Sequence, residues 1–278
     1  MSKVSPGYRD KELVETTLTA LSWNLWWRFG PWEERFPRIV KVVRECNPDL
    51  IGLQEIWDDD DVCQASLLAE ELGYAFTYSG ASEIVGIKFG NAVLSRWPIS
   101  FADSYPLTSM PSDDGSRNCR LAHASVEGPR GQIEVYSTHL SYLPFESGIR
   151  QLQVRDICRL IADRKSDVPP ILMGDFNAVP ESDEIRLLTG LKEPPVPYQV
   201  FYDAWQVANA HDPGYTWHRG NPYTAAALEP DRRLDYVFVG RPTGVGVGHV
   251  KSCRLVGTEA VDGVFPSDHY GVLAEIRY

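Results

Sequence analysis

The chain has 278 residues, of which 43% are hydrophobic and 23% are charged, and its formal net charge is −11. These proportions are typical of a folded domain and exclude a disordered chain, and one large hydrophobic core can accommodate this length. The negative charge disfavours a protein that binds long nucleic acid through a basic face. It does not exclude a phosphate-containing substrate, because a bound divalent cation can reverse the local charge.

Neither the cysteines nor the N-terminus points to a secreted or membrane protein. The five cysteines have no Cys-x-x-Cys spacing, so we expect no disulfide framework or structural zinc site. The first residues, MSKVSPGYRDKELVE, contain no apolar signal core, and no stretch approaches the roughly 18 apolar residues that a membrane span requires. We expect a cytoplasmic protein without a transmembrane segment or an evident protein partner. It would form a single domain over residues 1–278, with residues 1–16 as an N-terminal extension.

The first quarter of the chain alternates apolar runs with helical patterns. TLTALSWNLWW (17–27) and LIGLQEI (50–56) are typical of buried strands, and WEERFPRIVKVVREC (32–46) has its apolar residues at helical spacing. DDDDVCQASLLAEELG (58–73) predicts a helix that is capped by acidic residues and ended by Gly73. We interpret its four aspartates as a solvated cap rather than a metal cluster.

The middle of the chain is richer in strands. NAVLSRWPI (91–99), RLAHASV (120–126) and GQIEVYSTHL (131–140) predict strands in an antiparallel or mixed arrangement. A long helix, SGIRQLQVRDICRLIADR (147–164), follows them. PPILMGDFNAVP (169–180) then predicts a buried strand that runs into a loop.

The last third of the chain suggests how the elements are layered. ESDEIRLLTG (181–190) predicts a short helix, KEPPVPYQV (192–200) a proline-rich connection, and RRLDYVFVG (232–240) and YGVLAEIRY (270–278) the closing strands. Because helices do not separate the strands regularly, a doubly wound parallel sheet is disfavoured. The pattern predicts an α/β fold in which two sheets pack face to face with helices outside.

Polar side chains interrupt or end these apolar strands. A single buried carboxylate is normally a paired structural residue, but here nearly all the interruptions are carboxylates, carboxamides or imidazoles. Because the strand ends of a sheet pair converge on one edge, we expect a cluster of oxygen and nitrogen ligands there, suited to a hard divalent cation and a phosphate. The residues concerned are Asn24, Glu55, His139, Asp175, Asn177, Asp235, Asp268 and His269.

Several motifs in this set occur together in a known order. SWNLWW, LQE, STHL, GDFNAVP, RRLDYVF and SDHYG follow the order and approximate spacing of the endonuclease/exonuclease/phosphatase superfamily, which the chain resembles from about Leu18 to Tyr278. That superfamily includes pancreatic-type deoxyribonuclease, apurinic endonucleases, neutral sphingomyelinases and inositol polyphosphate 5-phosphatases. The resemblance implies a four-layer α/β sandwich with two mixed β-sheets, and metal-dependent hydrolysis of a phosphoester.

The resemblance also implies a metal site. It makes Glu55 the principal Mg²⁺ ligand, with Asn24 beside it and Asp268 as a further acid on the metal side. Asp175 could join a second metal. We expect Mn²⁺ to substitute for Mg²⁺.

The remaining site residues are matched to the chemistry of hydrolysis. By the resemblance, Asp175 and Asn177 act on the attacking water and the phosphate, His139 contacts the phosphate, and Asp235 orients His269. An imidazole titrates near neutral pH and suits a general base, and a carboxylate behind it fixes its tautomer. Either His269 or Asp175 could be the base, and we favour His269.

Substrate recognition is expected from loops around this site. Trp217 belongs to a TW pair that resembles a superfamily element near the site rim, and Arg232 could reach the substrate phosphate, although surface solvation competes as an explanation. The segments 105–120 and 211–233 are rich in turn-forming residues and long enough to be functional. We expect the second segment to form a rim or partial lid that hinders duplex DNA.

The sequence therefore predicts a Mg²⁺-dependent phosphoester hydrolase, specifically a phosphodiesterase for a small or flexible phosphodiester. The substrate could be a small molecule, a lipid headgroup ester or nucleic acid. One alternative is a DNA or RNA endo- or exonuclease of the same superfamily. Another is a catalytically silent binding scaffold, which the complete set of motifs disfavours.

Overall fold

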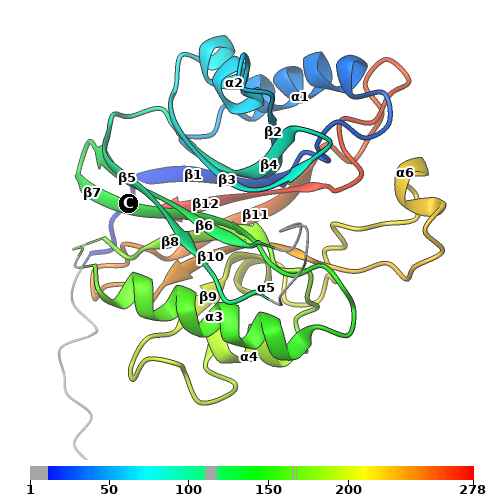
Figure 1. The fold of residues 1–278 in the computed structure, drawn as a ribbon. Coiled ribbons are helices and arrows are strands. Elements are labelled where there is room, and N and C mark those ends of the chain that lie inside the picture. The colour runs from blue at the N-terminus through cyan, green and yellow to red at the C-terminus, as the bar shows by residue number, and fades with distance from the viewer. Residues whose placement is uncertain (1–11, 110–117, 165, 167) are drawn as a thin grey trace, which may run out of the picture.

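The computed structural model describes residues 12–109, 118–164, 166 and 168–278 of the chain. In these ranges the strands form two six-stranded mixed sheets that are stacked face to face (Figure 1). The first sheet contains, in spatial order, β11 (Val250–Val256), β12 (Gly271–Arg277), β1 (Thr17–Asn24), β2 (Leu50–Asp58), β4 (Ile87–Ser95) and β3 (Ala75–Ile84). The second contains β5 (Ile99–Pro106), β6 (Arg120–Gly128), β7 (Gly131–His139), β8 (Ile171–Asp175), β10 (Asp235–Gly240) and β9 (Phe201–Asp203).

The helices lie on the two outer faces of this pair of sheets. Figure 1 shows α1 (Trp32–Cys46) and α2 (Gln64–Leu72) over the first sheet, and α3 (Ser147–Ala162) and α4 (Asp183–Thr189) beneath the second. Two short helices, α5 (Ala204–Ala208) and α6 (Pro222–Ala225), complete the set in the described ranges. None of the described helices is both long and apolar enough to cross a membrane.

Hydrophobic side chains fill each of the three interfaces between these layers. Val93 of the first sheet and Met173 of the second belong to one core cluster between the sheets. Val43 of α1 packs in a second cluster with residues of the first sheet, and Ile157 of α3 packs in a third with residues of the second sheet. The predicted four-layer α/β sandwich is therefore confirmed.

The first helix follows its sequence pattern closely. α1 has the predicted bounds and buries Ile39 against the first sheet. Glu33 and Glu34 lie in its first turn, where they complement the positive end of the helix dipole. Asn47 ends the helix in a left-handed conformation with φ 45°, which asparagine tolerates better than most residues.

The predicted acid cap on α2 is wrong. The helix begins at Gln64 after Cys63, without an acidic residue in its first turn. The preceding aspartates lie outside the helix, where Asp59 forms an ion pair with Arg28. The predicted end at Gly73 is confirmed, since this residue caps the helix with φ 71°.

The strand predictions need two corrections. The expected strand at 91–99 is divided, because β4 ends at Ser95 and β5 begins at Ile99. The sequence pattern also does not predict β3, β9 and β11. In β11 the pairing with β12 shifts register between Val250 and Ser252, and such an irregularity removes the alternation by which a strand is recognised.

The topology brings the ends of several strands to one edge, which we call the site edge. β1 runs antiparallel to β12, β8 runs antiparallel to β10, and β7 runs parallel to β8. The C-terminal ends of β1, β7 and β8 therefore lie beside the N-terminal ends of β10 and β12. These strand ends carry Asn24, His139, Asp175 and Asp235, and His269 lies just before β12.

Glu55 reaches the site edge in a different way from the one expected. It does not end its strand, because β2 continues to Asp58. The pairing of β2 with β4 shifts register between Leu53 and Ile56, and Glu55 has φ 55°. A bulge with a left-handed residue redirects a side chain, and the Glu55 side chain consequently faces a cavity at the site edge.

Candidate active site

A cavity of about 530 Å³ opens at the site edge and collects most of the predicted site residues. Asn24 and Asp235 are the two exceptions, since both are fully buried and contact the lining residues from behind. The predicted residues that line the cavity are Glu55, His139, Asp175, Asn177, Trp217, Arg232, Asp268 and His269.

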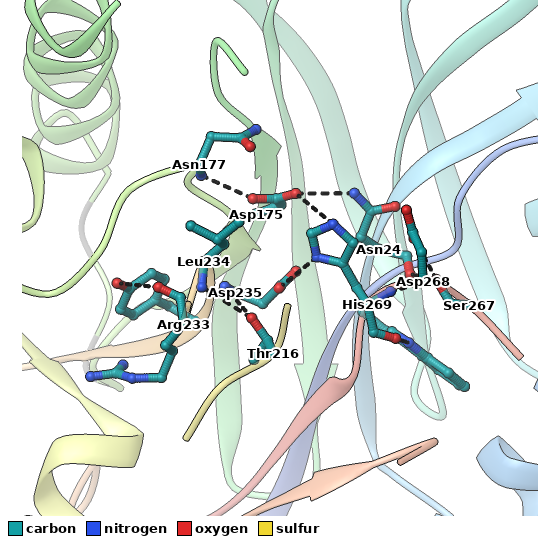
Figure 2. Close-up of polar contacts among 12 residues, drawn as sticks. Asn24, Asp175, Asn177, Thr216, Arg233, Leu234, Asp235, Ser267, Asp268 and His269 are labelled. Carbon is teal, nitrogen blue, oxygen red and sulfur yellow. Dashed lines mark hydrogen bonds and ion pairs between the residues drawn. The ribbon is translucent and has the colours of Figure 1, made fainter. Parts of the chain in front are cut away.

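Asp235 and His269 form a buried pair at the base of the cavity (Figure 2). His269 Nδ1 lies 2.8 Å from Asp235 Oδ2, and His269 Nε2 lies 3.8 Å from Asp175 Oδ2. The main-chain N–H groups of Leu234 and Asp235 donate to the Thr216 hydroxyl oxygen at 3.0 and 3.2 Å. The start of β10 is therefore held in place, and the second ring nitrogen of His269 is directed towards Asp175.

The charge of His269 is set by the carboxylates around it. Burial alone would lower the pKa of the imidazole, but the carboxylates of Asp235, Asp175 and Asp268 raise that pKa well above its usual value. The protonated form of His269 is therefore favoured while the negative charge of these three groups is not offset.

Asn24 connects the two sheets through its amide nitrogen. Its Nδ2 donates to Glu55 Oε1 and to Asp175 Oδ2, each at 3.0 Å. Its Oδ1 accepts from the main-chain N–H of Trp26 at 2.9 Å. Because a main-chain N–H can only donate, this contact assigns the oxygen to Trp26 and the nitrogen to the carboxylates. In this arrangement the Asn24 amide nitrogen orients two carboxylates. The amide oxygen, which would be the atom to bind a metal ion, faces the Trp26 N–H instead.

Three carboxylates on the cavity wall fit a hard divalent cation. Glu55, Asp175 and Asp268 all face the cavity, and carboxylate oxygens are preferred ligands of Mg²⁺. Burial raises the pKa of Asp268 to about 7, and the nearby charge of Glu55 adds to this effect. A bound cation would relieve the repulsion between Asp268 and Glu55.

A second group of possible ligand atoms lies close by. In the described part of the chain, ligand atoms of Asp175, Asp235 and His269 lie within 4.8 Å of one another. Since Asp235 and His269 already hydrogen-bond to each other, we interpret this group as a polar pair next to Asp175.

His139 and Asn177 lie on the second-sheet side of the cavity. His139 Nε2 lies 3.6 Å from Asp175 Oδ2 and 3.9 Å from Glu55 Oε1. Asn177 has φ 49°, its main-chain N–H donates to Asp175 Oδ1 at 2.9 Å, and its Nδ2 donates to the Leu140 carbonyl at 3.1 Å. Asp175 therefore accepts a hydrogen bond from Asn177 and lies near the His139 imidazole without a hydrogen bond to it.

The segment 211–233 contributes to the wall of the cavity. The Trp217 ring packs edge-on against His269, with centroids 5.1 Å apart. Arg232 faces the cavity and forms an ion pair with Glu229, whereas Arg233 is buried in an ion pair with Asp203 at 2.6 Å. The structure therefore shows which of the two adjacent arginines faces the cavity, a question that the sequence left open.

The structure adds two positioning residues to the predicted site. The Ser267 hydroxyl donates to the Asn24 carbonyl at 2.7 Å, and Asn221 Nδ2 donates to the carbonyls of Ser267 and Asp268 at 2.7 and 3.2 Å. Ser267 belongs to the SDHYG motif. Asn221 caps the start of α6, and the sequence did not indicate its contact with residues 267 and 268.

The segment 105–120 is the other loop expected to contribute to substrate recognition. Residues 110–117 lie outside the described residues. Of the part that is described, Asn118 and Cys119 line the cavity.

Gly174 allows close contact between two strands at the site edge. A Cβ at this position would lie 2.4 Å from the Thr138 carbonyl oxygen on β7. We expect Gly174→Ala to separate β7 from β8 and to lower the free energy of unfolding by about 1–3 kcal/mol, measured by urea denaturation. Gly148→Ala is the control, since its Cβ would meet nothing within 4 Å. Equal stability of the two variants would contradict this interpretation.

Comparison with known proteins identifies the family of this chain. The model of the Endonuclease/Exonuclease/phosphatase family matches residues 21–269. The inositol phosphosphingolipids phospholipase C of Schizosaccharomyces pombe is 28% identical over 207 residues, which cover 68% of this chain and 46% of that protein. Human tyrosyl-DNA phosphodiesterase 2 is 23% identical over 282 residues, which cover 99% of this chain and 72% of that protein.

Solved structures with a similar fold include one that contains DNA. The crystal structure of D. rerio TDP2, complexed with single strand DNA product, aligns with a TM-score of 0.73 at 20% identity, over 95% of this chain and 100% of that one. The chain spans less than half the length of the first three curated relatives that it matches, namely 30%, 46% and 34%.

Proposed function

This chain belongs to the endonuclease/exonuclease/phosphatase family, and from that premise we propose that it is a Mg²⁺-dependent phosphodiesterase that acts on a small or flexible phosphodiester. The observation that carries the proposal is the buried Asp235–His269 pair, which faces Asp175 in a cavity that Glu55 and Asp268 also line. Two relatives are named as a phospholipase C and a phosphodiesterase, which supports this reaction class.

Metal binding is assigned to carboxylates that the two sheets bring together at the site edge. We propose that Glu55, Asp268 and Asp175 hold Mg²⁺, and that Asn24 aligns Glu55 and Asp175 through its amide nitrogen. When bound there, Mg²⁺ neutralises the phosphate and stabilises the charge on the leaving oxygen. Mn²⁺ is expected to replace it.

Proton transfer is assigned to the Asp235–His269 pair. Asp235 holds Nδ1 of His269 at 2.8 Å and leaves Nε2 to face the cavity, which is the orientation a base requires. Because the surrounding carboxylates favour protonated His269, Asp175 stays the alternative base.

Phosphate contacts are assigned to His139, Asn177 and Arg232. An imidazole, a carboxamide and a guanidinium can each donate hydrogen bonds to phosphate oxygens as charge develops on them. Trp217 packs against His269, so we propose that its ring forms the wall of the substrate pocket next to the base.

The charge of the cavity supports a substrate with few phosphates. Among the described lining residues, Arg232 is the single lysine or arginine, and it already pairs with Glu229. A nucleic acid needs cations along several successive phosphates. Much of the remaining wall is apolar, formed by residues that include Trp26, Phe29, Ile84, Phe89 and Tyr142.

The first test is hydrolysis of bis-p-nitrophenyl phosphate with Mg²⁺ and with EDTA. We expect Mg²⁺-dependent turnover, and slow cleavage of plasmid DNA by the same preparation. Turnover of neither substrate would support a silent scaffold. Rapid cleavage of plasmid DNA would contradict the preference for small diesters and favour the nuclease alternative.

Shortening the outer part of segment 211–233 tests its role in selectivity. Ala227 and Glu229 line the cavity, whereas Trp217, Asn221 and Arg232 also hold other parts of the site. Replacing residues 225–230 by two glycines should leave hydrolysis of bis-p-nitrophenyl phosphate nearly unchanged. The rate on bulkier diesters relative to this substrate should rise on the order of tenfold, a size typical for pocket contacts. An unchanged ranking of substrates would remove the segment from substrate selection.

The cytoplasmic location and the single-domain organisation expected from the sequence stay predictions.

A further inference from the structure

Arg35, on the inner face of α1, is a buried cation that the sequence did not single out. Its side chain is 1% exposed and donates five hydrogen bonds, all to main-chain carbonyls. Nη1 donates to Leu25 at 2.8 Å and to Pro266 at 3.0 Å. Nη2 donates to Trp26 at 2.9 Å, to Trp27 at 2.8 Å and to Phe29 at 3.1 Å.

These carbonyls belong to two segments that are far apart in the chain. Residues 25–29 directly follow Asn24, and Trp26 and Phe29 from this segment line the cavity. Pro266 directly precedes Ser267, Asp268 and His269. One guanidinium therefore joins the loop that carries part of the cavity wall to the segment that carries the proposed base.

The first of these segments has an unfavourable backbone conformation. Trp26 has φ 57° and Trp27 has φ 36°, in the left-handed region that is costly for bulky residues. This turn directs four carbonyl oxygens towards the guanidinium. Such a conformation persists when the surroundings stabilise it. The hydrogen bonds of Arg35 contribute to that stabilisation, together with those from the Trp26 N–H to Asn24 Oδ1 and from the Trp27 N–H to the Glu55 carbonyl.

The chemistry of arginine suits this position. A planar guanidinium offers five N–H groups in a fixed fork, whereas lysine offers a compact ammonium on a flexible chain. Burial lowers the pKa of Arg35 to about 10, while the charges of Asp268, Tyr223 and Glu55 oppose this shift. The side chain therefore stays cationic at neutral pH.

We propose that Arg35 is a positioning residue, which fixes segment 25–29 against segment 266–269 and thereby sets the place of His269 relative to Asn24 and its carboxylate partners. The kinetic part of this inference rests on the proposed phosphodiesterase activity. A displacement of about 1 Å at a reacting group can cost on the order of 100-fold in rate, so a loosened junction should be measurable.

The main test compares Arg35→Lys with Arg44→Lys, below the melting temperatures of both variants. Arg44 lies on the same helix, is exposed and pairs with Glu71, so its variant should behave as the original protein. For Arg35→Lys we expect a fall in kcat for bis-p-nitrophenyl phosphate of about 10- to 100-fold, with KM changed much less. A folded Arg35→Lys with unchanged kcat would overturn the proposal.

Hydrogen exchange provides a readout that does not need activity. In Arg35→Lys the amides of residues 25–29 and 267–269 should exchange faster together, while those of α3 should not change. Unchanged exchange in segment 267–269 would contradict the proposed link. If the original protein lacks diesterase activity, the proposed function fails, but the exchange result still decides the role of Arg35.

A measurement on the unaltered protein covers the case in which Arg35→Lys does not fold. If Arg35 anchors both segments in the unaltered protein, they should open as one unit. Native-state hydrogen exchange across a denaturant series should then give the same opening free energy for the amides of both segments. Different opening energies for segments 25–29 and 267–269 would count against a common anchor.

Discussion

Replacing Glu55 by glutamine is expected to abolish Mg²⁺-supported hydrolysis of bis-p-nitrophenyl phosphate while the protein stays folded. The change removes one negative charge from Glu55, Asp175 and Asp268, the three carboxylates proposed to hold Mg²⁺, with almost no change in volume. We expect a loss on the order of 10³ or more, at least the size seen when one group that stabilises transition-state charge is removed. Activity should be measured across a Mg²⁺ titration.

The fold and the metal affinity of this variant are measured separately. Thermal melting of the metal-free protein should change little, whereas calorimetry should show weaker Mg²⁺ binding. Glu70→Gln, at an exposed position of α2, is the matched control and should retain activity. Turnover of Glu55→Gln at low Mg²⁺ equal to that of the original protein would remove Glu55 from the metal site.

The second large effect concerns the Asp235–His269 pair, whose members should act as one unit. Asp235→Asn removes the carboxylate that holds Nδ1 of His269, and His269→Ala removes the imidazole itself. Each change should reduce kcat by about 10⁴, by analogy with the Asp-to-Asn change in a serine protease triad. The double variant should lose little more, because its second change removes a partner that no longer has a function.

This cycle also decides between the two candidate bases. If the losses multiply, Asp235 and His269 act independently, and Asp175 becomes the better candidate for the base. Thermal melting of each variant should accompany the kinetics, because Asp235 is fully buried. A loss of kcat in a variant that is unfolded at the assay temperature would support neither His269 nor Asp175 as the base.

A large part of the fold follows from local patterns in the sequence. The apolar spacing in residues 32–46 predicts α1 with its observed bounds, and Gly73 correctly marks the end of α2. Such signals are readable because a helix cap or a buried face depends on residues a few positions apart. β11 escapes prediction because its bulge interrupts the alternation of its side chains.

Most of the predicted site residues are recognisable in the same way, as polar interruptions or ends of apolar strands. Their convergence depends on topology, and the order of strands in the two sheets brings the ends of β1, β7 and β8 together with the beginning of β10. The motifs therefore identify residues that the fold brings together at the site edge. They do not show which atom of each side chain contacts which neighbouring residue.

Local periodicity in the sequence predicts two stacked sheets with helices outside and polar residues that interrupt or end their strands. The resemblance carried by the six motifs implies the family and its four-layer sandwich. Four features of the site are visible in the folded molecule alone: a bulge directs Glu55 into the cavity, Asn24 presents its nitrogen to the carboxylates, Arg232 rather than Arg233 faces the cavity, and Arg35 joins two segments. Each of these outcomes depends on register, on the nearest available hydrogen-bond acceptor, or on a contact between residues distant in the chain. Packing of the whole molecule sets those quantities, and no local pattern in the sequence contains them.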